Sequence, residues 1–120
     1  MIGIKMEREV IVTTTPEIPG YKVTKVIGFV HGSSVRTRGI GGKIIAGIEA
    51  IVGGRGTAYL HELEKAREEA INHLKSKARQ MGANAVIGVD VETTEILEGF
   101  IIVTAYGTAV VVKPESEPAQ

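Results

Sequence analysis

Residues 60–91 decide the fold, and they read LHELEKAREEAINHLKSKARQMGANAVIGVDV. Apolar side chains recur here every three or four residues over about six turns, which predicts one long amphipathic helix. They are Leu60, Leu63, Ala66, Ala70, Ile71, Leu74, Ala78 and Met81. Glutamates come early in this stretch and basic residues late, the order that the helix dipole favours. Gly82 then stands at the position of a C-terminal cap, so the helix is expected to end there.

Directly after this cap, residues 85–92 alternate in the manner of a strand. The pattern puts Ala85, Ile87, Val89 and Val91 on one face, and Val86, Gly88, Asp90 and Glu92 on the other. A turn is expected at residues 93–98 and a long final strand at residues 100–112. Residues 10–13 and 21–35 predict two earlier strands, the second with bulges or close packing at Gly28 and Gly32.

A second, shorter helix is predicted between these halves, at residues 40–52. Its apolar stripe consists of Ile40, Ile44, Ile48 and Ile51, widened by Ile45 and Val52. The order strand, strand, short helix, long helix, strand, strand predicts a two-layer α+β domain with a mostly antiparallel sheet.

The final predicted strand is apolar on both faces, which is typical of a sheet covered on both sides. A chain of 120 residues has little further core in which to bury the isoleucine-rich helix as well. A second copy of the chain is the simplest cover, so the sequence predicts a homo-oligomer. The alternative is that the short helix folds over its own sheet.

The composition is that of one globular domain. Lys plus Arg and Asp plus Glu both number 14, so no general attraction to nucleic acid or to an anionic membrane is expected. The chain has no cysteine, which excludes disulfides and thiolate metal sites. No stretch has the character of a signal peptide or a membrane span, and the expected location is cytoplasmic.

Five short stretches, taken in order, resemble a known family. They are VIGFVHG at residues 26–32, VGG at 52–54, AREEA at 66–70, GANAVIGV at 82–89 and YGTAV at 106–110. Their order and spacing are similar to the YbjQ-like family of small uncharacterised proteins, often labelled heavy-metal-binding. The resemblance implies a dodecin-like subunit in a homo-oligomeric ring, typically a pentamer, with no established activity. We expect one such domain at residues 1–113 and a disordered tail at residues 114–120.

Metal ligands are the first candidates for a site. Asp90 and Glu92 share a face of their predicted strand, where unpaired carboxylates are costly if they point inward. They are therefore expected at a subunit junction, in a central channel or at an exposed sheet margin. His31 is a weaker candidate ligand, with a structural hydrogen bond as the alternative. A divalent ion is thus a candidate cofactor, although the missing cysteines argue against a soft metal.

The long helix offers two further ligand sets by spacing alone. One face has His61, Glu64 and Glu68, and another has Glu62, Glu69 and His73. Solvated surface charge is the simpler interpretation of both sets.

A small anion is the second candidate ligand. Arg36, Arg38 and Lys43 flank glycines ahead of the short helix, where free N–H groups and the helix dipole favour phosphate or carboxylate. The spacing matches neither a Walker A loop nor a dinucleotide fingerprint. A loop that contacts the next subunit is the alternative interpretation.

No catalytic motif stands out, because Ser33 and Ser34 near His31 lack a Gly-x-Ser-x-Gly elbow. The leading hypothesis is a non-enzymatic ring protein that binds an ion or a small ligand at subunit junctions. The alternatives are a small-molecule enzyme with shared sites near Arg36, Arg38, Asp90 and Glu92, and a purely structural scaffold.

Overall fold

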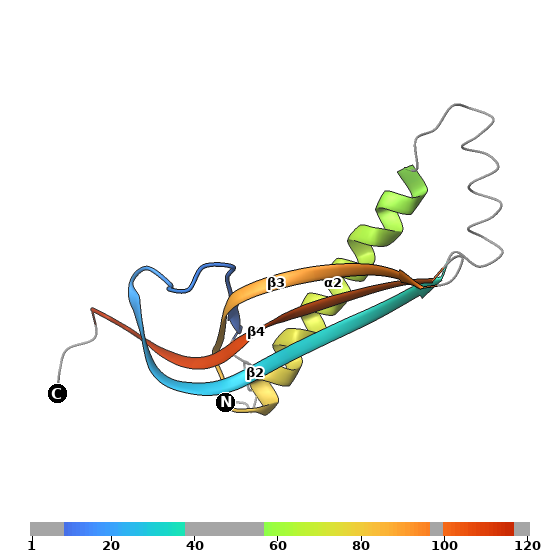
Figure 1. The fold of residues 1–120 in the computed structure, drawn as a ribbon. Helices are drawn as coiled ribbons and strands as arrows, with labels where there is room; N and C mark the ends of the chain where they lie inside the picture. Colours follow the sequence, from blue (N-terminus) through green and yellow to red (C-terminus); the bar gives the residue numbers. More distant parts are fainter. Residues whose placement is uncertain (1–8, 38–56, 97–99, 117–120) are drawn as a thin grey trace, which may run out of the picture.

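The computed structural model describes residues 9–37, 57–96 and 100–116. This part of the chain has four strands, β1 (Ile11–Val12), β2 (Tyr21–Thr37), β3 (Ala85–Ile96) and β4 (Phe100–Pro114), and the helix α2 (Thr57–Gln80). The strands form one curled sheet in the order β1-β3-β4-β2, and α2 crosses one face of it (Figure 1). The β3–β4 and β4–β2 pairs are antiparallel, whereas the short β1–β3 pair is parallel. The α+β class is confirmed, and the sheet is mixed.

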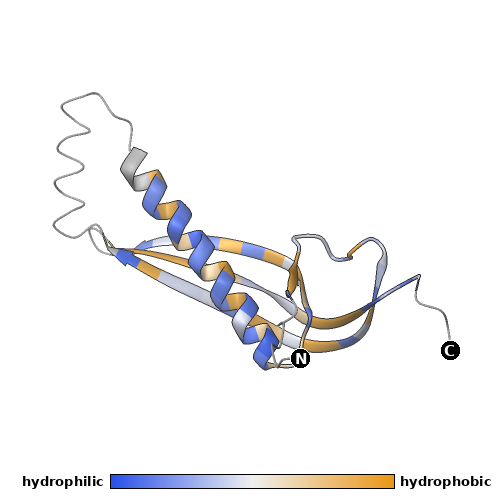
Figure 2. Ribbon diagram, turned by 180° about the vertical axis from the view of Figure 1, so that it is seen from behind, coloured by the Kyte–Doolittle hydropathy of each residue, from blue (hydrophilic) through white to orange (hydrophobic). Residues whose placement is uncertain are grey.

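The predicted long helix is confirmed as α2, and it lies very close to the sheet. Its buried face presents mainly small side chains, with Ala66, Ala70 and Ala78 fully buried beside Leu74. The closest approach is at Gly32 of β2, where an added Cβ atom would lie 2.6 Å from the carbonyl oxygen of Ala70 and still closer to the backbone nitrogen of Leu74. The expected close packing at Gly32 is therefore confirmed, because only a residue without a Cβ fits there. The outward side of α2 is largely hydrophilic (Figure 2).

Gly82 ends the helix as predicted. It has a positive φ of 92°, and its N–H donates to the carbonyl of Arg79 at 3.0 Å. The N–H of Ala83 donates to the carbonyl of Ala78 at 2.9 Å. These two bonds form a Schellman motif, which satisfies carbonyls at the end of the helix and turns the chain into β3.

The regular alternation expected for residues 85–92 was wrong, because β3 contains a bulge. The pairing with β4 passes from Ile87↔Thr108 directly to Asp90↔Tyr106, which leaves Gly88 and Val89 opposite one residue. Gly88 has a φ of 61°, a conformation that glycine adopts without strain. Val86 and Val89 consequently both pack in the core beside α2, while Ile87 packs on the other face.

The strand ends also differ from the prediction. β3 continues to Ile96 through the expected turn, because Thr93 and Thr94 pair with Val103 and Ile102 of β4. β-Branched threonines are well suited to an extended, half-exposed strand. β2 continues to Thr37 and β4 to Pro114, which pairs with Tyr21. The predicted short helix at residues 40–52 lies outside the described residues.

The two faces of the sheet are covered unequally. On the α2 side, Ile101, Val103, Ala105 and Ala109 of β4 are fully buried in the main core. On the opposite side, Val110 and Val112 pack with Ala85, Ile11, Ile18 and Ile87 in a small second cluster. The prediction that both faces of the last strand are dry therefore holds within one chain only near its C-terminal end.

Candidate functional site

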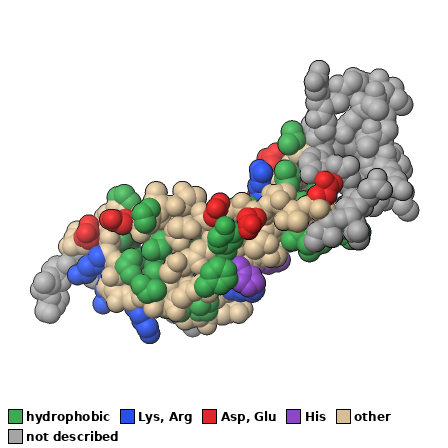
Figure 3. All heavy atoms as spheres, in the orientation of Figure 1, with side chains coloured by type: hydrophobic (Ala, Val, Ile, Leu, Met, Phe, Trp, Pro, Cys, Tyr) green, Lys and Arg blue, Asp and Glu red, His purple; other side chains and the backbone are tan. Residues whose placement is uncertain are grey.

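The candidate site lies on the face of the sheet that α2 leaves uncovered, which we call the helix-distal face. Cross-strand pairing places its residues in rows that run from β3 across β4 to β2. The rows are Ile87–Thr108–Phe29, Asp90–Tyr106–His31, Glu92–Thr104–Ser33 and Thr94–Ile102–Val35. Figure 3 shows this face, where hydrophobic, acidic and histidine side chains lie close to one another.

Aromatic and acidic side chains meet at the centre of this face. The ring of Phe29 lies 5.6 Å from that of His31 and 6.3 Å from that of Tyr106, measured between centroids. The hydroxyl of Tyr106 donates to Oδ2 of Asp90 at 3.4 Å, and the N–H of Val91 donates to Oδ1 of Asp90 at 2.8 Å. The negative charge of Asp90 raises the pKa of Tyr106, with smaller contributions from desolvation and from Glu92. The carboxylates thus favour the protonated phenol, which remains a hydrogen-bond donor.

The three predicted metal ligands share this face but do not meet. Tyr106 stands between Asp90 and His31 in their row, so their Cα atoms are about 10 Å apart, two strand spacings. In the described part of the chain, no three His, Asp or Glu side chains come together as a metal site. Hence His31, Asp90 and Glu92 of one subunit do not fit a metal centre by themselves.

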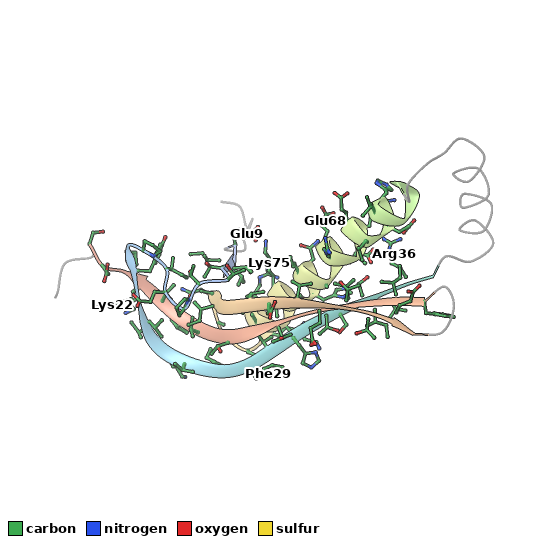
Figure 4. The ribbon with its side chains drawn as sticks, turned by 45° about the horizontal axis from the view of Figure 1, so that its top comes forward. Glu9, Lys22, Phe29, Arg36, Glu68 and Lys75 are labelled. Carbon is green, nitrogen blue, oxygen red and sulfur yellow. The ribbon has the colours of Figure 1, made fainter. Side chains whose placement is uncertain are left out.

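Arg36 points to the other side of the sheet, toward α2 (Figure 4). Its guanidinium donates to Oε2 of Glu69 at 2.7 Å and to Oε2 of Glu62 at 3.2 Å. The hydroxyl of Ser34 donates to Oε1 of Glu69 at 2.5 Å. Next to them, Nδ1 of His73 lies 2.7 Å from the carbonyl oxygen of Ser33. These contacts form a polar seam between β2 and α2.

The seam changes the interpretation of two predictions. Glu62, Glu69 and His73 do share a helix face, but they contact β2 and are not merely solvated, as the simpler interpretation held. The hydrogen bond from Ser34 lowers the pKa of Glu69, assisted by the charge of Arg36 and opposed by desolvation. Arg36 already has two carboxylate partners, which compete with any bound anion. Arg38 and Lys43, the other two candidates for that site, lie outside the described residues.

An exposed apolar stripe follows β2 on the helix-distal face. Val26 is 65% exposed, Phe29 68% and Val35 59%, and Val23 is also exposed. Val23, Val26 and Phe29 are three residues apart, a spacing that would alternate between faces in a regular strand. Two register shifts in the pairing with β4 restore them to one face, where they lie beside Val112, Val110 and Thr108. The bulges of β2 therefore bring three exposed apolar side chains onto one face.

The sequence of this chain matches one protein family along nearly its whole length. A family model described as "Putative heavy-metal-binding", that of YbjQ, matches residues 10–113. A UPF0145 protein of Methanoregula boonei is 47% identical over 95% of both chains, and one of Methanocella arvoryzae is 45% identical over 92% of both. The chain belongs to the YbjQ family. A Thermus thermophilus member is 39% identical over 91% of this chain and 96% of its own.

A solved structure supports the fold of this YbjQ-family chain. A Pediococcus pentosaceus protein of unknown function, assigned to the DUF74 family, superposes with a TM-score of 0.61. The match covers 87% of this chain and 98% of the other at 19% identity, so it bears on the fold alone. Within the described residues, no helix has the length and apolar character needed to cross a membrane.

Sequence reasoning missed the part that Phe29 and Tyr106 play in the site. Each was placed in the correct strand, but their contact depends on the register between β2 and β4. It also missed the Ser34–Glu69–Arg36 contacts, although the shared helix face of Glu62, Glu69 and His73 was an available signal. A search for basic residues on a strand opposite that helix face would have indicated Arg36.

Proposed function

We propose that this YbjQ-family protein is a non-enzymatic, cytoplasmic subunit that assembles with copies of itself into a ring and binds an ion or a small ligand where subunits meet. The family likeness favours a dodecin-like subunit and a pentamer. The observation that carries the proposal is the apolar stripe of Val23, Val26, Phe29 and Val35 on an edge strand.

The free energy available from covering this stripe is large. Full burial of a valine or phenylalanine side chain contributes roughly 1.5–3 kcal/mol, and three of these side chains are more than half exposed. Exposed large apolar side chains that form one continuous patch are typical of protein interfaces. A second subunit of the same chain is the partner that is always present at matching concentration.

The polar groups beside the stripe support a ligand at the same junction. Asp90 and Glu92 are exposed carboxylates next to the aromatic pair of Phe29 and Tyr106. One subunit holds too few ligands for a metal ion among its described residues. At a junction the side chains of two subunits can contribute to one site, which is why we place the ion or ligand there.

Native mass spectrometry before and after chelator treatment tests this function. We expect an oligomer that carries additional mass per junction. Mass that chelator removes would indicate a cation, and mass that resists chelator would indicate a small organic ligand or an anion. A monomer at micromolar concentration would contradict the proposal, and a bare oligomer would leave only a structural scaffold.

A further inference from the structure

Both long edges of the sheet are free over much of their length in the described chain. No described strand lies outside β2. On the opposite edge, the first residues of β3 pair with β1. The segment that follows β1 then accepts two hydrogen bonds from β3, from Gly88 N–H to Thr15 O and from Val89 N–H to Thr13 O. Beyond Val89, no described segment pairs with the outer side of β3. Unpaired edges of this kind are templates for pairing with another chain.

The two free edges carry opposite charge. The basic residues of β2 are Lys22, Lys25 and Arg36, together with His31, and the strand has no acidic residue. The acidic residues of β3 are Asp90, Glu92 and Glu95, and the strand has no basic residue. Two β2 edges placed together would bring like charges into proximity, whereas β2 against β3 brings opposite charges together.

The register within one subunit shows where these charges lie along the edges. His31, Tyr106 and Asp90 form one cross-strand row, and Arg36, Ile101 and Glu95 form another. We propose that β2 of one subunit pairs in parallel with β3 of the next in continuation of these rows. His31 then lies beside the partner's Asp90, and Arg36 lies beside the partner's Glu95. This arrangement rests on the proposed self-assembly and specifies its surface.

The topology, together with a ring axis that runs along the strands, gives the direction of pairing. β2 and β3 are both antiparallel to β4, so within one subunit they run in the same direction. A rotation about an axis along the strands keeps that direction, so β2 and the next subunit's β3 are parallel. Such a head-to-tail contact uses different surfaces on its two sides, and it closes into a ring when the rotation closes.

Other registers place fewer opposite charges beside each other. A shift by one residue turns the acidic side chains to the opposite face from their cations. A shift by two residues leaves Arg36 opposite the partner's Thr93 or beyond the end of β3. In the row register, Arg36, whose Nε has no hydrogen-bond partner among the described residues, shares its row with the partner's Glu95.

The pairing also completes the candidate site. Within one subunit, β4 separates His31 from Asp90 and Glu92. Across the junction, no strand intervenes, so His31 comes next to the partner's Asp90 with the partner's Glu92 one row away. His31, which β4 keeps apart from the two carboxylates within one subunit, thus becomes their neighbour only in the assembly.

Engineered cysteines test this pairing directly, because the chain has no cysteine of its own. The variant carries Ser33→Cys and Glu92→Cys, which share a row with Thr104 between them. Within one subunit the two Cα atoms are about 10 Å apart, and a disulfide needs less than about 7 Å. We expect a ladder of disulfide-linked multimers under oxidising conditions, and its collapse to single chains on reduction.

Matched variants make the result specific. Ser33→Cys alone and Glu92→Cys alone are expected to give no ladder, and Ser33→Cys with Thr93→Cys, whose side chains lie on opposite faces, is expected to give much less. Efficient dimers from Ser33→Cys alone would overturn the proposal in favour of β2–β2 contact. An oligomer by native mass spectrometry that gives no ladder would overturn this pairing and leave the proposed self-assembly standing. A monomer would overturn both.

Discussion

The two faces of the sheet are built from the same strands, yet their apolar side chains differ in exposure to solvent. Val30 of β2 is 3% exposed beneath α2, while its neighbour Phe29 is 68% exposed on the helix-distal face. β-Propensity does not distinguish them, because alternate residues of one strand share one backbone conformation. The difference is what covers each face: within the described residues, α2 covers one side of the sheet, and large apolar side chains of β2 stay exposed on the other. We propose that a second subunit covers the apolar side chains of the helix-distal face.

Gly32→Ala is expected to have the largest effect on the sealed face. The new Cβ would collide with the backbone of Ala70 and Leu74, which side-chain rotation cannot relieve. We expect a loss of about 3 kcal/mol or more in the free energy of unfolding, measured by chemical denaturation. Ser33→Ala is the control on the opposite face, where only the hydrogen bond to Thr104 is lost and about 1 kcal/mol is expected. Equal losses for the two variants would contradict the close approach.

Val103→Ala and Val35→Ala compare the two faces with the same chemical change. Val103 is fully buried beside α2, so its truncation should cost about 2 kcal/mol of unfolding free energy in every state of assembly. Val35 is 59% exposed, so its truncation should leave the dissociated chain within about 0.5 kcal/mol of the original. It should instead raise the concentration at which the oligomer dissociates. Chemical denaturation measures the unfolding free energy, and analytical ultracentrifugation measures the dissociation of the oligomer. A Val35→Ala variant that lost folding stability without weaker assembly would contradict the difference between the two faces.

Glu69→Gln tests the polar seam on the α2 side through its pH dependence. The pKa of Glu69 in the folded chain lies below its ordinary value of 4.5, mainly because Ser34 donates to the carboxylate. A lowered pKa stabilises the fold above pH 4.5, and that stabilisation disappears as the pH falls through the folded value. The difference in unfolding free energy between the original chain and Glu69→Gln should therefore shrink below pH 4.5. Glu68→Gln removes the same charge from an exposed neighbour, and an identical pH curve for both variants would contradict the seam.

Asp90→Asn should give the smallest effect, confined to the helix-distal face. The charge of Asp90 is the main cause of the raised pKa of Tyr106, so its removal should lower that pKa with little change in stability. NMR titration of the Tyr106 ring separates it from the other two tyrosines. Glu95→Gln is the control, because Glu95 pairs with Ile101 and lies on the other face. A Tyr106 pKa that does not change in Asp90→Asn would show that the two groups are not coupled.

Much of the fold was predictable because it depends on local patterns. The long helix follows from apolar spacing between Leu60 and Met81, and its end follows from Gly82. The bulge at Gly88 was not predictable from alternation, since Ala85 to Val91 reads as a regular strand until its partner is known. Residues 93–96 likewise continue as strand only because β4 offers a partner, and no local signal distinguishes that from a turn.

The sequence indicated which sheet face the candidate residues share, but not how the strands arrange them. His31, Asp90 and Glu92 do lie on one face of the sheet. However, β4 lies between the strand of His31 and the strand that carries the two carboxylates. Arg36, a candidate for an anion site, contacts Glu62 and Glu69 of α2, which its position in the sequence did not indicate. Strand order and helix placement decide both points, and these depend on contacts between residues far apart in the sequence.

The most direct test of the central claim is the mass in solution of the original chain and of a variant with Val26→Asp and Phe29→Asp. Both changed residues lie on the exposed stripe, away from the α2 core, so the variant should retain its circular dichroism spectrum. We expect a closed oligomer for the original chain and a folded monomer for the variant in native mass spectrometry at micromolar concentration. A monomeric original chain, or a variant that assembles as before, would contradict this expectation.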